Sequence, residues 1–143
     1  MKLIMANVFD NIVGAKHVVA ESSMLKATGA GHILSMKCQK NLDNGSIVTR
    51  GEWIESQIFK TDDYAAGKKP YLVLTPPFGY NSDRRSYQDE CYFYNAAGEV
   101  ARCYELYVDD IFTVSSDAIT ALASEPVVGN YVSVENGLYK EAA

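Results

Sequence analysis

Turn signals recur at short intervals from residue 32 onward, and this spacing limits the possible folds more than any other feature of the sequence. Two Asn-Gly pairs, at 44–45 and 136–137, and an Asn-x-x-Gly sequence at 95–98 are typical of tight turns. The runs between turn signals are rich in β-branched and aromatic residues and too short for ordinary helices. We assign nine of them to strands: 32–38, 46–49, 52–60, 71–75, 91–94, 100–108, 111–115, 127–134 and 138–140.

Nine strands and little helix predict a mainly β protein, built as a small antiparallel β-barrel or sandwich. The apolar run 71–75 predicts a strand that is buried on both faces, and Pro76-Pro77 ends it. Ser116 resembles the N-cap of one short helical turn that runs to Leu122. With 143 residues, 48% of them hydrophobic, the chain is long enough for a single domain with its own core.

The segment 91–104 carries the sharpest local prediction, a hairpin that turns at 95–98. Placing Asn95 opposite Glu99 brings Cys91 opposite Cys103, with Gly98 at positive φ. We expect both thiols to be free. The chain has three cysteines, and this odd number without paired spacing does not resemble a secreted disulfide framework.

Residues 1–30 differ from the rest, and we predict an N-terminal arm there, followed by one β domain over 31–143. The arm has apolar side chains with weak periodicity, and Thr28-Gly29-Ala30-Gly31 ends it. Its predicted partner-binding anchors are Val8, Phe9, Ile12 and Val13. The alternative is an ordinary edge strand and a helical turn that pack on the domain's own core.

A long polar connection covers residues 78–90. Loops of this length are uncommon in compact domains and are often binding loops. The alternative is a surface loop without a ligand.

Charge and hydropathy exclude several classes of partner. Thirteen basic and eighteen acidic residues give a net charge of −5, so we expect no nucleic-acid partner. No apolar run approaches the length of a membrane span, and Asn7 and Asp10 interrupt the apolar N-terminus before a signal-peptide core is complete. We expect an unprocessed protein made inside the cell, with no membrane partner.

Nothing in the sequence has the pattern of a catalytic or metal site. His17 and His32 lack neighbours at zinc-ligand spacing, so we expect no metal and no cofactor. The acidic pairs 62–63, 89–90 and 109–110 lie at predicted turns, where carboxylates normally serve solvation and turn geometry. We therefore expect no enzymatic activity.

Five segments together resemble the capsid decoration (cement) proteins, small virion structural proteins of tailed bacteriophages that infect Gram-positive bacteria. The matching segments are 6–12, 42–48, 94–102, 109–115 and 128–132, and they span most of the chain. The resemblance lies in the arrangement of the segments, and none of them is a catalytic signature.

This resemblance implies a non-enzymatic protein that binds the major capsid protein on the outer surface of an assembled shell and stabilises it. It implies a compact β domain whose N-terminal arm engages the shell, by β-augmentation in physical terms. It also implies synthesis in the bacterial host cytoplasm and a place on the virion surface, as a homotrimer or as a monomer.

Two other classes of function remain open from the sequence. One is a small β-barrel module that binds a carbohydrate or peptide through Trp53 and the tyrosines of the 78–90 loop. The other is a small β-barrel enzyme with unrecognised carboxylates. Binding to isolated shells favours the capsid decoration protein over both, and retention on glycans favours the binding module.

Overall fold

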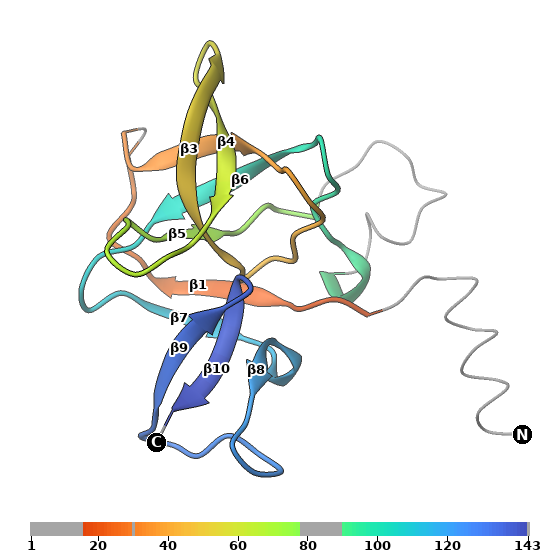
Figure 1. Cartoon of the computed structure of the whole chain (residues 1–143), viewed down its shortest axis with the longest axis vertical. Helices are drawn as coiled ribbons and strands as arrows, with labels where there is room; N and C mark the ends of the chain where they lie inside the picture. Colours follow the sequence, from red (N-terminus) through yellow and green to blue (C-terminus); the bar gives the residue numbers. More distant parts are fainter. Residues whose placement is uncertain (1–15, 30, 78–89, 143) are drawn as a thin grey trace, which may run out of the picture.

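A computed structural model describes residues 16–29, 31–77 and 90–142. This part of the chain holds ten strands and two single 3-10 turns, and no α-helix. The strands form three layers: a closed barrel, the β1–β7 pair beneath it, and a three-stranded C-terminal sheet below that pair (Figure 1). In chain order the elements are β1 (Ala20–Met24), β2 (Ile33–Lys37), β3 (Ile47–Glu55), β4 (Ile58–Asp63), β5 (Tyr71–Val73), η2 (Glu90–Tyr92), β6 (Val100–Glu105), β7 (Ile111–Val114), η3 (Ser116–Ala118), β8 (Ile119–Thr120), β9 (Tyr131–Glu135) and β10 (Leu138–Ala142).

The barrel confirms the predicted mainly β fold. Its strands follow the order β2-β4-β3-β5-β6, and β6 closes the ring against β2. Four of the five pairings are antiparallel, but β2 and β4 are parallel, so the barrel is mixed where we expected an antiparallel one. The cause is the order in which the chain fills the barrel. From β2 the chain runs to β3, two places away, and the β3–β4 hairpin then brings β4 back between β3 and β2.

The barrel encloses the larger part of the buried core. Strand β5 is buried at all three positions, as the apolar run predicts. Met36 of β2 and Val73 of β5 have no exposed surface, and they pack with Cys38, Leu42 and Cys103. This close packing means that the barrel interior is filled by side chains.

The structure corrects the hairpin predicted over 91–104. Cys91 lies in the η2 turn, and Cys103 in β6 has Leu34 and Val73 as its strand partners. Both edges of β6 are therefore occupied by β2 and β5. Asn95 forms an isolated bridge with Leu42 instead, which holds the preceding segment against a different part of the barrel.

Two local parts of that prediction hold. Gly98 turns the chain at φ +87°, and the N–H of Glu99 donates to the carbonyl of Ala96. All three cysteines are free thiols, as expected.

The run 52–60 was predicted as one strand, and it contains a hairpin turn. Strand β3 extends to Glu55 and β4 begins at Ile58, so the chain reverses at Ser56 and Gln57. Ser56 adopts φ +48° without being glycine, which is why the turn carries no strong sequence signal.

Residues 16–29 of the predicted arm pack on the chain's own domain. Strand β1 pairs antiparallel with β7, and the adjacent Val18 is buried in a second cluster with Ile47, Leu72 and Tyr139. In this segment the alternative of an edge strand on the core is the one observed. The anchors predicted for partner binding, Val8, Phe9, Ile12 and Val13, lie outside the described residues.

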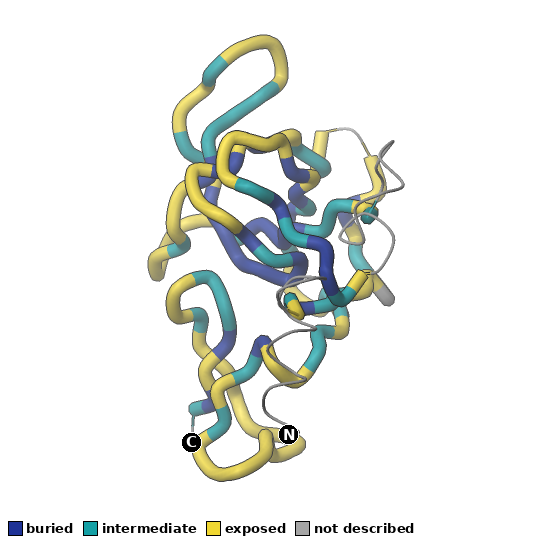
Figure 2. Tube along the Cα trace, turned by 90° about the vertical axis from the view of Figure 1, so that its right-hand side faces the viewer, coloured by how far each residue is buried: buried dark blue, intermediate teal, exposed yellow. Residues whose placement is uncertain are grey.

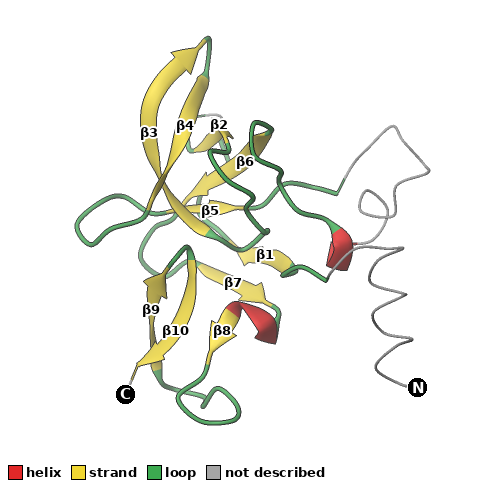
Figure 3. Ribbon diagram, turned by 45° about the vertical axis from the view of Figure 1, so that its right-hand side comes forward, coloured by secondary structure: helices red, strands yellow, loops and turns green. Residues whose placement is uncertain are grey.

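The short helix predicted from Ser116 is a single 3-10 turn. Ser115 holds the N-cap position, and from Ile119 the backbone is extended. Two residues of β8 then pair in parallel with β10 (Figure 3). The ladder with β10 supplies these residues with the hydrogen bonds that a longer helix would have supplied.

The predicted terminal hairpin is confirmed as β9 and β10, joined by the two-residue turn Asn136-Gly137, both at positive φ. The hairpin is held to the upper layers by two short hydrogen bonds. The Tyr139 hydroxyl donates to the Gly45 carbonyl at 2.6 Å, and the N–H of Ile47 donates to the Gly137 carbonyl at 2.7 Å. The C-terminal sheet is thereby fixed beneath the barrel.

Candidate interaction surface

The loop between β8 and β9 exposes most of its apolar side chains. Val128 is fully exposed, and Leu122, Val127 and Val132 are each more than half exposed, while Tyr131 at the start of β9 is 81% exposed. This loop forms the exposed end of the molecule opposite the barrel (Figure 2). We call Leu122, Val127, Val128 and Tyr131 the apolar end surface, because Val132 points to the opposite face of β9 from Tyr131. Exposed apolar groups that cluster in this way are typical of protein interaction sites.

One buried carboxylate holds this loop in place. Glu141 of β10 accepts hydrogen bonds from the N–H groups of Leu122 and Val127, both at 2.9 Å, and from the side-chain amide of Asn130 at 2.7 Å. These hydrogen bonds, the one from Leu122 first, hold the pKa of Glu141 below its ordinary value. The loop is therefore tied to the sheet at three points, and its apolar side chains point outward from a fixed backbone.

Strand β9 forms the outer edge of the C-terminal sheet, whose order is β8-β10-β9. In the described part of the chain no strand pairs with its other edge. Val134 packs against the second core cluster, whereas Tyr131, Ser133 and Glu135 on the opposite face are exposed. The edge thus adjoins the apolar end surface and continues it along the sheet.

The surroundings of this surface are acidic. Between residues 116 and 142 the sequence has four carboxylates and one basic residue, Lys140. Lys140 already forms an ion pair with Glu135, at 3.1 Å. The local charge therefore favours a basic partner.

A second candidate site lies beside the β3–β4 hairpin, which rises above the barrel in Figure 1. Trp53 is 63% exposed, and its indole N–H donates to the Ser56 carbonyl at 2.9 Å. A groove of about 450 Å³ runs between this hairpin and β2, lined by Trp53, Phe59 and Leu34 together with the polar side chains of Ser35 and Gln57. One aromatic face next to polar groups is a suitable surface for a sugar ring.

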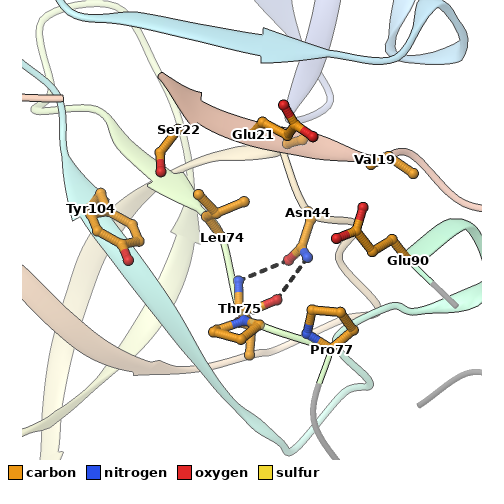
Figure 4. Close-up of a pocket in the computed structure, with 11 residues that line it drawn as sticks. Val19, Glu21, Ser22, Asn44, Leu74, Thr75, Pro77, Glu90 and Tyr104 are labelled. Carbon is orange, nitrogen blue, oxygen red and sulfur yellow. Dashed lines mark hydrogen bonds between the residues drawn. The ribbon is translucent and has the colours of Figure 1, made fainter. Parts of the chain in front are cut away.

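A third hollow, of about 440 Å³, lies between β1 and the end of β5 (Figure 4). Asn44 points across it to Thr75, accepting a hydrogen bond from its N–H and donating one to its carbonyl. Asn44 also accepts from the Asn95 amide at 3.1 Å. Its polar atoms are thus occupied by the fold itself, and Glu21 and Glu90 also line the hollow.

His17 is paired with a carboxylate. Its Nδ1 lies 2.7 Å from Asp43, its ring stacks on Tyr94, and the N–H of Val18 donates to the other oxygen of Asp43. These contacts attach the segment before β1 to the barrel.

His32 lies in a separate cluster. Its Nδ1 is 3.0 Å from the buried Glu105 and 2.7 Å from the Tyr107 hydroxyl, and Lys69 forms an ion pair with the same Glu105. No group of three or more His, Cys, Asp or Glu side chains arranged to hold a metal occurs among the residues that the structure describes.

The buried thiols stay protonated at neutral pH. Burial, with a smaller contribution from Glu99, raises the pKa of Cys38 to about 11, and burial also raises the pKa of Cys103 strongly. Because the thiolate is the reactive form, these two cysteines are expected to be inert toward electrophiles.

The sequence predictions pointed to other places than the apolar end surface. The four arm anchors, and the tyrosines of the 78–89 segment, lie outside the described residues, whereas Trp53 lies at the groove described above. The apolar end surface was not predicted, because 127–134 was assigned to a strand, and strand β9 begins only at Tyr131. The signal that points to it is the Val127-Val128 pair between Pro126 and Gly129, two apolar residues in a turn sequence.

Comparison with protein-family models, with curated proteins and with solved structures gives no match for this chain. Within the described residues, no helix is both long enough and apolar enough to cross a membrane.

Proposed function

We propose that this protein is a non-enzymatic virion structural protein, which binds the major capsid protein on the outside of a tailed-phage shell and stabilises the shell. The observation that carries the proposal is the apolar end surface, which Glu141 holds in an outward-facing arrangement. The resemblance to capsid decoration proteins supplies the class of partner. Synthesis in the bacterial host cytoplasm agrees with the three free thiols.

A fixed surface suits attachment to an assembled shell. A loop that is already ordered loses little conformational entropy on binding, so more of the contact energy appears as affinity. Each bound copy stabilises the shell subunits that it contacts, because binding to the assembled form shifts the equilibrium toward that form. A homotrimer and a monomer both satisfy this argument.

The arm anchors Val8, Phe9, Ile12 and Val13 stay a predicted second contact. Attachment at two separate points would allow one copy to span neighbouring shell subunits. The proposal therefore assigns shell binding to the apolar end surface and keeps the arm as a second predicted contact with the shell.

The test is binding to shells assembled from the major capsid protein of the same phage, read as occupancy after sedimentation. Val128→Asp is expected to reduce occupancy at least about tenfold, because a charge then enters an apolar contact. Val108→Asp is the matched control: Val108 is 83% exposed on the β6–β7 loop, outside the proposed surface, and its replacement is expected to leave occupancy unchanged. No binding of the unaltered protein refutes the proposed function, and equal binding of both variants refutes the proposed surface.

The groove at Trp53 supports one alternative, a carbohydrate-binding module. Under that alternative the protein is retained on bacterial cell-wall glycans, and Trp53→Ala abolishes retention while Val128→Asp does not. Under the proposed function, retention on glycans is absent and Trp53→Ala decorates shells normally.

A further inference from the structure

We propose that the outer edge of β9 binds an extended segment of the partner as an added strand, and that this segment alternates aliphatic with basic side chains. The inference rests on the proposed function for the identity of the partner, the shell protein. The backbone of β9 would bind the partner segment by hydrogen bonds, in addition to the apolar contacts that the apolar end surface makes.

The register of the hairpin determines which backbone groups are available. Glu135 and Leu138 flank the two-residue turn, and in such hairpins the flanking pair is hydrogen bonded. Hydrogen-bonded pairs then recur at every second residue, so Ser133 and Tyr131 also face β10. The N–H and C=O groups of Val132 and Val134 face the outer edge, where no described strand meets them. They form the template for one more antiparallel or parallel strand.

The side chains of β9 specify the chemistry of that strand. Val132 is more than half exposed, and Val134 lies on the same face, at the rim of the second core cluster. Aliphatic side chains of an added strand extend this apolar face. On the opposite face Glu135 is exposed and already pairs with Lys140, so basic side chains at the alternate positions are favoured by the net negative charge of residues 116–142.

Two of the other described edges are less suitable. The β1–β7 pair has a register shift between Ser22 and Met24, which disturbs the regular spacing of an edge. Strand β8 is only two residues long. By contrast β9 is five residues long, pairs with β10 in unbroken register, and contains neither lysine nor proline, the residues that commonly protect an edge.

The first test uses a synthetic peptide of alternating lysine and valine as the probe, added to the isotope-labelled full chain. We expect the amide hydrogen exchange of Val132 and Val134 to slow at least about tenfold, with little change at Ser133, whose N–H already faces β10. The controls are a peptide of the same composition with its lysines and valines in separate blocks, and an alternating peptide of glutamate and valine. Unchanged exchange at Val132 and Val134 with the alternating lysine peptide, or equal slowing with all three peptides, overturns the inference.

The second test uses shells. Val132→Pro removes one outward N–H and leaves the β9–β10 ladder intact, so the variant is expected to remain folded and to bind shells about five- to tenfold more weakly. Val132→Ala is the control that shortens the side chain and keeps the N–H. If the unaltered protein binds shells and Val132→Pro binds as well as Val132→Ala, the added strand is wrong and the proposed function stands. If the peptide slows exchange at β9 and the protein does not bind shells, the proposed function is wrong and the strand-binding edge stands.

Discussion

At the scale of single residues, Glu141 has the largest structural role in the candidate surface. Its carboxylate is buried and accepts three hydrogen bonds, two of them from the backbone of the loop that presents the apolar side chains. Glu141→Gln would place the side-chain NH2 group opposite one of these donors and would remove the negative charge that accepts their hydrogen bonds. The arrangement of the loop therefore depends on one ionised group.

Glu141→Gln is expected to lower the free energy of unfolding at pH 7 and to flatten its dependence on pH. The pKa of Glu141 is lowered in the folded state, so its stabilisation is fully present above the ordinary glutamate pKa of roughly 4.3 and is lost as the pH falls through the folded value. Urea unfolding at pH 7 and pH 3 measures this, with Glu125→Gln on the same exposed loop as the control. An equal loss of stability on acidification in Glu141→Gln and in the unaltered protein contradicts the prediction.

At the scale of elements, Gly45 is the point where the three layers meet. Its N–H donates to the Val73 carbonyl of the barrel, and its carbonyl accepts from Tyr139 of the C-terminal sheet. A Cβ placed on it would lie 3.0 Å from Val114 and 3.1 Å from Ala20, on the β1–β7 pair. The layers therefore approach one another so closely because this position has no side chain.

Gly45→Ala is expected to lower the free energy of unfolding by about 3 kcal/mol, from left-handed backbone strain together with overpacking. Gly98→Ala separates these two causes, because Gly98 has nearly the same φ but no described atom lies within 4 Å of the position that its Cβ would occupy. Its cost is expected to be about 1–2 kcal/mol, from backbone strain alone. Thermal and urea unfolding measure both, and equal costs would show that the layers are not closely packed at Gly45.

At the scale of the whole molecule, residues 16–26 of the N-terminal region belong to the packed domain. Removing residues 1–15 leaves β1 and Val18 in place, so this truncation is the reference for a longer one. Removing residues 1–26 also deletes β1 and the buried Val18, whose lost burial alone costs about 1.5–3 kcal/mol. Calorimetry of the two truncations checks the difference, and a stable protein without residues 1–26 would contradict the packing of β1.

The same truncation tests the arm anchors. If Val8, Phe9, Ile12 and Val13 contact the shell, the protein without residues 1–15 folds normally and occupies shells less fully, and Phe9→Asp in the full chain has a similar effect. Undiminished occupancy would leave the apolar end surface as the whole attachment site.

The local features of this protein follow from the types of a few neighbouring residues. Asn136-Gly137 and Gly98 adopt the turns that their residue types favour, and the apolar run at 71–75 gives a strand with both faces buried. These features depend on the φ preferences and hydropathy of a few adjacent residues, which are properties of the sequence itself. The pairing of the strands depends instead on contacts between distant segments of the folded chain. Cys103 faces Leu34 and Val73 and not Cys91, because closing the barrel places β2 and β5 on the two edges of β6. The apolar end surface has the same origin: Glu141 fixes a loop that lies 11 to 19 residues earlier in the chain, and a contact between separate segments leaves no pattern in either segment alone.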